Sequence, residues 1–147
     1  MKSLFYFLLI VVSVVFIGSK PNHDPSKRSL EGTWELRDQY TYDGTKVVDT
    51  IPNTDGYRQI KMYYNGKVMW TRFVPKDSVE WFGYGTYYIT DTSLVETLEY
   101  GSASMMQIVD TMRVFSFKLE LQDNYYSQIA TDGDGNPIYS ENYIRID

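Results

Sequence analysis

The sequence contains no cysteine and only one histidine among its 147 residues. The absence of cysteine excludes disulfides, thiolate catalysis, cysteine-based metal sites and lipid attachment through an N-terminal cysteine. His23 lies near the N-terminus in a segment without hydrophobic periodicity, so the rest of the chain offers neither a histidine metal ligand nor the base of a Ser-His-Asp triad. These absences argue against an enzyme, and the sequence predicts no catalytic residue, no metal site and no cofactor.

Basic residues are also few. Lys and Arg number 14 against 19 Asp and Glu, which gives a net charge of −5 at pH 7. Nucleic acids and anionic membrane surfaces are bound through clusters of basic side chains. The charge balance therefore predicts that nucleic acid is not a partner.

The one long hydrophobic run stands at the N-terminus. Lys2 precedes a predominantly apolar segment over residues 4–17, and the small residues Gly18 and Ser19 follow it. This pattern is typical of a secretory signal peptide over residues 1–19, and the run is short for a membrane span, which needs about 20 apolar residues. We therefore expect an exported protein, periplasmic or extracellular, with no membrane span after cleavage. An uncleaved N-terminal anchor is the alternative.

Residues 20–29 hold two prolines and several charged residues, which indicates a flexible tether ahead of one domain over residues 30–147. In that domain, short alternating segments recur between turn signals such as Asp43-Gly44 and Asn65-Gly66. The predicted strands cover residues 32–42, 57–64, 67–74, 80–90, 93–100, 113–121, 125–131 and 137–146. Residues 45–56 are expected to form a loop, and residues 101–110 a loop or a single helical turn. Gly83 and Gly85 predict a bend or bulge within their strand.

Eight such strands can form a sandwich or close into a barrel. We predict the barrel, all-β, antiparallel, eight-stranded and up-and-down, because closure removes exposed sheet edges. Without the predicted signal peptide the chain holds 13 Tyr against 4 Phe and 3 Trp. Tyrosine has an apolar body and a polar tip, which suits a partly wet barrel interior, although tyrosine is also simply a good strand residue.

Two positions at the ends of the predicted domain carry a family resemblance. Gly32-Thr33-Trp34 on the first strand, with Arg145 on the last, resembles the lipocalin signature. In lipocalins the tryptophan closes one barrel end, and an arginine from the last strand packs over it. The resemblance therefore implies that Gly32, Trp34 and Arg145 close the barrel.

The chain also resembles a group of lipocalin-like (calycin-type) exported proteins of Bacteroidetes, whose function is largely unknown. The similarity lies in residues 30–36, 60–66 with Met69-Trp70, 83–87, 96–100 and 141–145. In the last block the aromatic residue two positions before the arginine is often Trp, and here it is Tyr143. The resemblance covers nearly the whole domain and implies its fold. It does not imply a function, because the group has no established shared ligand.

Trp70 and Arg72 share one face of the third predicted strand. If that face points inward, Trp70 is a stacking platform and Arg72 an anion clamp in a ligand site. If it points outward, Met69, Thr71 and Phe73 face the interior instead. We favour the first arrangement, because a lone exposed tryptophan is unfavourable.

Three acidic residues are candidates for interior positions. Glu96 and Glu99 differ by an odd number, so only one of them can point inward on a regular strand. Glu141 shares a face with Tyr143 and Arg145. An internal carboxylate needs a partner, and a structural ion pair is favoured over a catalytic acid. Candidate partners are Arg58, Arg72 and Arg113.

The sequence thus predicts an exported protein that holds a small hydrophobic or amphipathic ligand inside a barrel. The predicted ligand-binding residues are Trp70, Arg72, Tyr87, Tyr100, Phe117 and Tyr143. The alternative is a barrel filled by its own side chains that acts as a structural or protein-interaction module through loops at 45–56 and 101–112.

Overall fold

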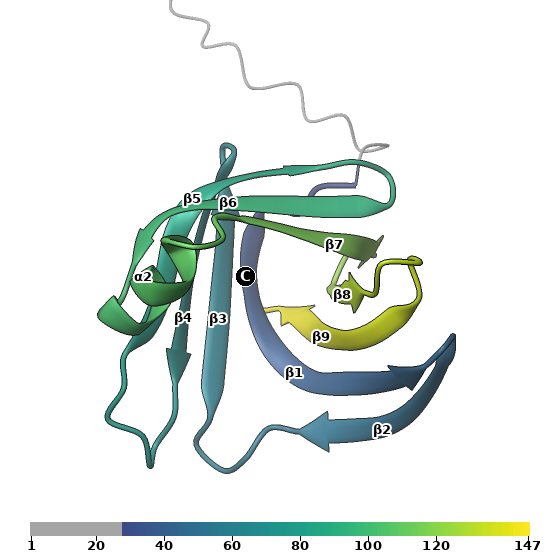
Figure 1. Ribbon diagram of the computed structural model, residues 1–147, viewed down its shortest axis with the longest axis horizontal. Coiled ribbons are helices and arrows are strands. Elements are labelled where there is room, and N and C mark those ends of the chain that lie inside the picture. The colour runs from purple at the N-terminus through teal and green to yellow at the C-terminus, as the bar shows by residue number, and fades with distance from the viewer. Residues whose placement is uncertain (1–27) are drawn as a thin grey trace, which may run out of the picture.

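The structure, a computed structural model, describes residues 28–147 (Figure 1). The predicted signal peptide lies outside the described residues, as does most of the predicted tether. Nine strands and one short helix make up the described part of the chain. They are β1 (Gly32–Asp43), β2 (Lys46–Pro52), β3 (Arg58–Tyr64), β4 (Lys67–Phe73), β5 (Trp81–Ile89), β6 (Ser93–Gly101), α2 (Ala103–Val109), β7 (Val114–Leu121), β8 (Tyr125–Thr131) and β9 (Pro137–Arg145).

Eight of these strands close into a ring. Strands β3 to β9 pair antiparallel in chain order, and β1 pairs with β3 on one edge and with β9 on the other. Trp34 of β1 stands opposite Arg145 of β9 in this closing ladder. The prediction of an all-β, antiparallel, closed eight-stranded barrel is confirmed.

The ninth strand corrects the prediction of a loop over residues 45–56. β2 forms a hairpin with the second half of β1, from Asp43 opposite Lys46 to Asp38 opposite Pro52. β3 and β2 share one edge of β1. β3 pairs with residues 32–35 of β1, and β2 pairs with residues 38–43. The Val, Thr and Ile residues of this segment suit a strand, but every β2 residue is exposed, so no alternation of apolar and polar residues marked it in the sequence.

Two predicted backbone features follow from residues with special conformations. Asn65 and Gly66 both have positive φ, 47° and 73°, and join β3 to β4 by a two-residue turn of the type I′ kind. The bulge expected near Gly83 and Gly85 is confirmed as a register shift between Tyr84 and Gly85 in the β5–β6 ladder.

One end of the barrel is closed by Trp34 and Arg145. The guanidinium carbon of Arg145 lies 4.1 Å from the centroid of the Trp34 ring, and the ring is fully buried. Trp34 Nε1 donates to the Leu30 carbonyl (2.8 Å), and Arg145 donates to the carbonyls of Glu31 (2.7 Å) and Asp123 (2.8 Å). These contacts tie the first and last strands to the segment that precedes β1 and to the turn between β7 and β8.

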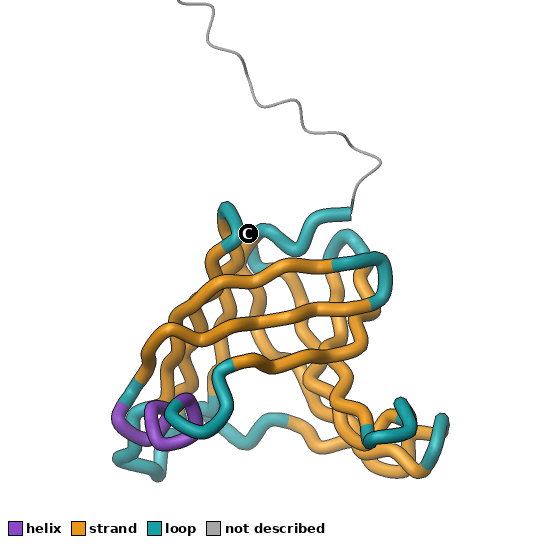
Figure 2. Tube along the Cα trace, turned by 45° about the horizontal axis from the view of Figure 1, so that its top comes forward, coloured by secondary structure: helices purple, strands orange, loops and turns teal. Residues whose placement is uncertain are grey.

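The helix α2 lies at the opposite end from the C-terminus (Figure 2). It packs against β5 and β6, and Ser102 caps it by accepting from the Met105 backbone N–H. Of the two alternatives for residues 101–110, the short helix is the one observed. After α2, the first half of β7 pairs with β6 but not with β8, because the β7–β8 ladder runs only from Lys118 to Leu121.

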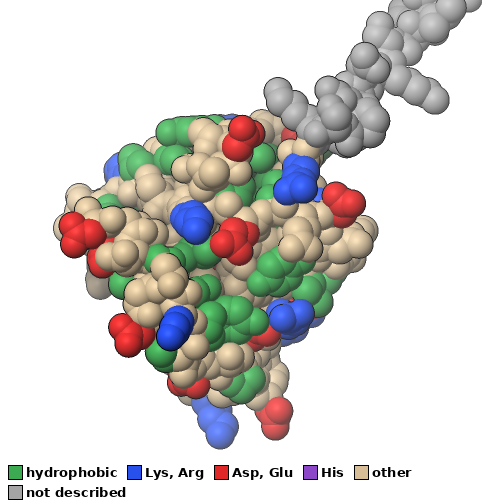
Figure 3. All heavy atoms as spheres, turned by 90° about the vertical axis from the view of Figure 1, so that its right-hand side faces the viewer, with side chains coloured by type: hydrophobic (Ala, Val, Ile, Leu, Met, Phe, Trp, Pro, Cys, Tyr) green, Lys and Arg blue, Asp and Glu red, His purple; other side chains and the backbone are tan. Residues whose placement is uncertain are grey.

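The interior has three layers. An apolar cluster around Trp34, Tyr63 and Tyr126 fills the closed end, and a second cluster around Trp70 and Met105 lies near α2. Buried polar side chains separate the two clusters, namely Gln59, Lys61, Glu96 and Gln128. On β4 the buried residues are Val68 and Trp70, so the face favoured by the sequence is the inner one. On the outer face shown in Figure 3, acidic and basic side chains are interspersed among apolar ones.

Candidate functional site

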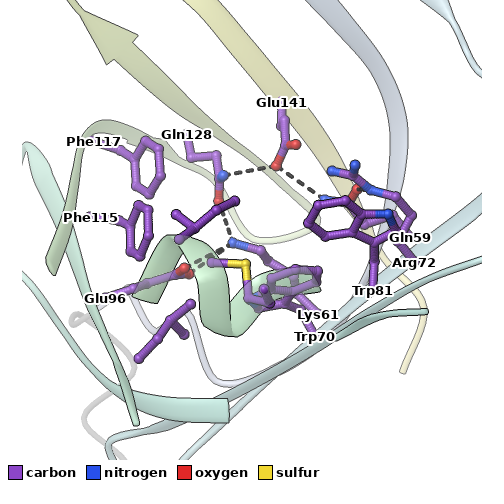
Figure 4. Close-up of a pocket in the computed structure, with 13 residues that line it drawn as sticks. Gln59, Lys61, Trp70, Arg72, Trp81, Glu96, Phe115, Phe117, Gln128 and Glu141 are labelled. Carbon is purple, nitrogen blue, oxygen red and sulfur yellow. Dashed lines mark hydrogen bonds and ion pairs between the residues drawn. The ribbon is translucent and has the colours of Figure 1, made fainter. Parts of the chain in front are cut away.

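A cavity of about 300 Å³ opens inside the barrel at the α2 end. Its lining combines the polar middle layer with the apolar cluster beside α2 (Figure 4). The lining residues are Gln59, Lys61, Trp70, Arg72, Trp81, Glu96, Leu98, Met105, Ile108, Phe115, Phe117, Gln128 and Glu141. The volume stands at the lower end of the range of ligand pockets, about 300 to 1,000 Å³.

The apolar wall comes from β4, β5, β7 and α2. Phe115 and Phe117 of β7 lie on one side of the cavity, and Trp70 and Trp81 lie on the other. Trp70 fits because Gly83, its neighbour across the β4–β5 ladder, has no side chain. A Cβ at Gly83 would stand 2.7 Å from Trp70 Nε1, closer than van der Waals contact allows. Gly83 therefore leaves the room in which the Trp70 indole forms part of the cavity wall.

A buried ion pair forms part of the polar side. Lys61 Nζ donates to both oxygens of Glu96, at 2.9 and 3.2 Å, and to Oε1 of Gln128 at 2.8 Å. Tyr63 also donates its hydroxyl to Glu96 Oε1, at 2.6 Å. The side chains of Lys61 and Glu96 are each only 4% exposed. All three ammonium protons have acceptors, which a lysine in the interior of a barrel requires.

A second polar group lies at the side of the cavity formed by β3, β4 and β9. Glu141 Oε2 accepts from Tyr143 (2.6 Å), Gln128 (2.8 Å) and Gln59 (3.2 Å). Gln59 Oε1 accepts in turn from Arg72 Nε at 3.0 Å. Gln59 thus connects a carboxylate to a guanidinium, and Figure 4 shows its side chain between Glu141 and Arg72.

Tyrosines surround these polar groups, and burial holds them in the neutral form. Burial is the main cause that raises the pKa of Tyr63 and of Tyr143 well above the usual value, and the charges of Glu96 and Glu141 add to it respectively. Burial likewise raises the pKa of Tyr57, where Arg72 opposes the shift and Glu141 adds to it. The neutral hydroxyls of Tyr63 and Tyr143 therefore donate to Glu96 and Glu141, and that of Tyr57 donates to Gln59 Oε1 at 2.8 Å.

Three of the six predicted ligand-binding residues line the cavity. Trp70 and Arg72 project from β4, and Phe117 projects from β7. Tyr143 lies next to the cavity, where it is fully buried, stacks on Tyr126 at 4.7 Å between ring centroids, and donates to Glu141. Its hydroxyl contacts two residues that line the cavity, because it donates to Glu141 and accepts from Gln59.

Tyr87 and Tyr100 lie away from the cavity. Tyr87 packs edge-on against Tyr63 in the closed-end cluster, at 4.8 Å between ring centroids. It is six residues beyond the cavity-lining Trp81 on β5, which corresponds to about 20 Å along a strand. Tyr100 is 53% exposed and lies outside the barrel against Tyr84. The register shift makes Leu98 the partner of Gly85 and Tyr100 the partner of Tyr84, so one residue is skipped and the face of Tyr100 is inverted.

Sequence reasoning also missed the partner of the internal glutamate. Glu96 points inward and Glu99 outward, as the odd spacing required, but the cation beside Glu96 is Lys61. Two of the three expected arginines are paired on the surface instead, Arg58 with Glu35 and Arg113 with Asp110. The available signal was parity, because Gln59, Lys61 and Tyr63 share one face of β3.

Within residues 28–147 no group of three or more His, Cys, Asp or Glu side chains is arranged to hold a metal ion. None of the helices in that same range is long and apolar enough to cross a membrane.

Comparison with known proteins shows which fold the chain shares with solved structures. No family model and no curated protein matches the chain. Two solved structures are similar, each with a TM-score of 0.53 over 80% of this chain. One is an uncharacterized protein from Bacteroides eggerthii, 19% identical and matched over 100% of its chain. The other is a lipocalin-like protein from Bacteroides uniformis, 17% identical and matched over 98% of its chain. The closed antiparallel barrel described above is thus lipocalin-like.

Proposed function

We propose that this protein is an exported binding protein that holds a small, mostly apolar molecule in the cavity at the α2 end of the barrel. The observation that carries the proposal is the cavity itself, with flat aromatic side chains on one wall and hydrogen-bonded polar groups on another. Mostly apolar pockets with a few oriented polar groups are typical of small-molecule sites. Export is inferred from the signal pattern in residues 1–19.

The filled barrel that acts through its loops has less support. A barrel packed solid would leave no space of about 300 Å³ beside Trp70 and Trp81. One of the two loops expected to carry its contacts is largely the strand β2, which pairs with β1.

Two kinds of measurement test the binding function. Native and denaturing mass spectra of the purified protein without its predicted signal peptide would reveal a co-purified molecule. Titration with an apolar fluorescent probe, followed by tryptophan emission, would reveal uptake, since two of the three tryptophans, Trp70 and Trp81, line the cavity. We expect the emission of these two residues to change and that of Trp34, at the closed end, to stay constant.

Substitutions on α2 locate the binding. Ile108 lines the cavity and is partly exposed, so Ile108→Trp places an indole in the space without disturbing the buried core. Gln107 is its exposed neighbour and does not line the cavity, so Gln107→Trp is the matched control. We expect probe affinity to fall at least tenfold in the first variant and to be unchanged in the second. Equal affinity in the two variants, or no co-purified molecule and no probe uptake, would refute the proposal.

A further inference from the structure

The four charged groups that line the cavity differ in how well they are satisfied. Lys61 and Glu96 satisfy each other, with Gln128 and Tyr63 as further partners. Arg72 and Glu141 do not contact each other, because none of the ion pairs within 4.0 Å in residues 28–147 includes either of them. Lys61 and Glu96 therefore form an ion pair, whereas Arg72 and Glu141 are a separated pair, two opposite charges that are not in contact.

Each member of the separated pair presents polar atoms that no described residue engages. Arg72 donates only through Nε, to Gln59, and Glu141 accepts only through Oε2. Arg72 Nη1 and Nη2 and Glu141 Oε1 remain. No buried side-chain nitrogen or oxygen among the described residues lacks a hydrogen-bond partner, so these three atoms have accessible surface. Both residues line the cavity, which makes them the available polar contacts for a bound molecule.

The separation between the two groups is short. Gln59 is 2% exposed, and one carboxamide reaches both, with Oε1 3.0 Å from Arg72 Nε and Nε2 3.2 Å from Glu141 Oε2. A single carboxamide thus spans the space between them, so a small molecule with its anionic and cationic centres close together can contact both groups.

The charge of the lining decides what kind of molecule fits. Lys61 and Arg72 balance Glu96 and Glu141, so the lining is electroneutral when all four are ionised. A monoanion on Arg72 would add an uncompensated charge near Glu141, and a monocation on Glu141 would do the same near Arg72. A molecule with one charge of each sign pairs with both groups and keeps the cavity neutral.

We propose that the ligand is a small zwitterion with an apolar or aromatic side chain, of the α-amino acid class. This inference rests on the proposed binding function. The carboxylate accepts from the Arg72 guanidinium, the ammonium group donates to Glu141 Oε1, and the side chain lies against Trp70, Trp81 and Phe115. Arg72 is pre-oriented for this role, since its guanidinium lies over the Trp81 ring at 5.7 Å while Nε is held by Gln59.

Calorimetric titration with four probes tests the ligand class. L-Phenylalanine carries both charges, 3-phenylpropionate only the negative one, 2-phenylethylamine only the positive one, and indole none. We expect phenylalanine to bind at least tenfold more tightly than either singly charged probe. If 3-phenylpropionate or 2-phenylethylamine binds as tightly as phenylalanine, the zwitterion proposal fails. Indole binding without any preference for phenylalanine overturns this inference and leaves the proposed function intact. No binding by any of the four probes also overturns this inference, and the proposed function fails with it if the apolar fluorescent probe is not taken up and no molecule co-purifies.

Variants assign the two contacts. Glu141→Gln keeps the shape of the side chain and an acceptor for its three donors, and Arg72→Gln removes the guanidinium charge. We expect each to weaken phenylalanine binding at least tenfold. Arg58→Gln is the matched control, because Arg58 is adjacent to Gln59 but points outward, where it pairs with Glu35. Circular dichroism and thermal melts establish that each variant is folded. Unchanged phenylalanine affinity in a folded Glu141→Gln protein would exclude the ammonium contact and with it the proposal.

Discussion

Gly83 and Trp70 face each other across the β4–β5 ladder, and the missing side chain of Gly83 is the space that the Trp70 indole occupies. The contact lies inside the barrel at the wall of the cavity. It explains why a glycine stands in the middle of a strand, where glycine is otherwise unfavourable.

The first prediction concerns this contact. Gly83→Ala places a Cβ within 3.1 Å of three indole atoms of Trp70, so the ring must shift into the cavity. We expect a loss of about 1 to 3 kcal/mol in the free energy of unfolding, from overpacking, together with weaker ligand binding. Denaturant titration and probe titration measure the two effects. Gly133→Ala, at a turn where nothing lies within 4 Å, is the control and should be close to neutral.

The second prediction compares two Lys–Glu pairs of the same chemistry. Lys61–Glu96 is buried, whereas Lys67–Glu99 has side chains 48% and 47% exposed. Lys61→Met leaves Glu96 unpaired inside the barrel and should cost about 3 to 5 kcal/mol. Lys67→Met should cost about 0 to 1 kcal/mol. The double variant Lys61→Met, Glu96→Leu should be more stable than Lys61→Met alone, and chemical denaturation of the four proteins checks the order. Equal losses from the two lysine substitutions would show that the buried pair has no special weight.

The third prediction concerns alkaline pH. Burial raises the pKa of Tyr63, Tyr126 and Tyr143 above the usual value of 10.0, and that of Tyr87 to about 12. The neutral form is thus favoured in the folded protein, and the unfolded chain releases these protons more readily. The resulting stability is fully present below pH 10 and is lost as the pH rises through the folded-state values.

The measurement for this third prediction is a pair of titrations. The free energy of unfolding should decline from about pH 10 upward, the usual tyrosine pKa. Tyrosinate absorbance of the buried tyrosines should appear together with unfolding. Absorbance from all tyrosines that develops fully while the barrel remains folded would contradict the burial seen in the structure.

The fourth prediction concerns the closed end. Arg145→Lys keeps the charge but loses the planar contact with Trp34, and should cost about 1 kcal/mol. Arg145→Ala also removes the hydrogen bonds to the carbonyls of Glu31 and Asp123, so its loss should be larger. Thermal unfolding gives the order. Arg58→Ala is the control, because Arg58 is exposed and its ion pair with Glu35 lies at the surface. A loss in Arg58→Ala as large as that in Arg145→Ala would contradict the role given to Arg145.

Local patterns in the sequence predicted most of the barrel. Alternation of apolar and polar residues predicted the strands of the ring. Asn65-Gly66 predicted the turn between β3 and β4, and Gly83 and Gly85 predicted the bulge in β5. Each of these features depends on residues close together in the chain. β2 was missed for a physical reason. Its residues are all exposed, so no burial pattern distinguished it from a loop.

The site was harder to predict because it depends on distances across the barrel. Lys61 and Glu96 are 35 residues apart, and nothing near either residue in the chain marks the pair. Tyr100 shows a second cause. A single skipped residue in the β5–β6 ladder inverts the face of every position beyond it, so Tyr100 is exposed although it lies two residues beyond the buried Leu98.

The partial pairing of β7 has a mechanical consequence. Its first half, before Lys118, is held to the ring through β6 alone, and α2 precedes it in the chain. The wall that carries Phe115 and Phe117 therefore depends on one backbone ladder and on the packing of these two side chains against the core. At the opposite end Trp34 of β1 is paired on both edges, with Lys61 of β3 and Arg145 of β9, so the two ends of the barrel differ in how many ladders hold their strands.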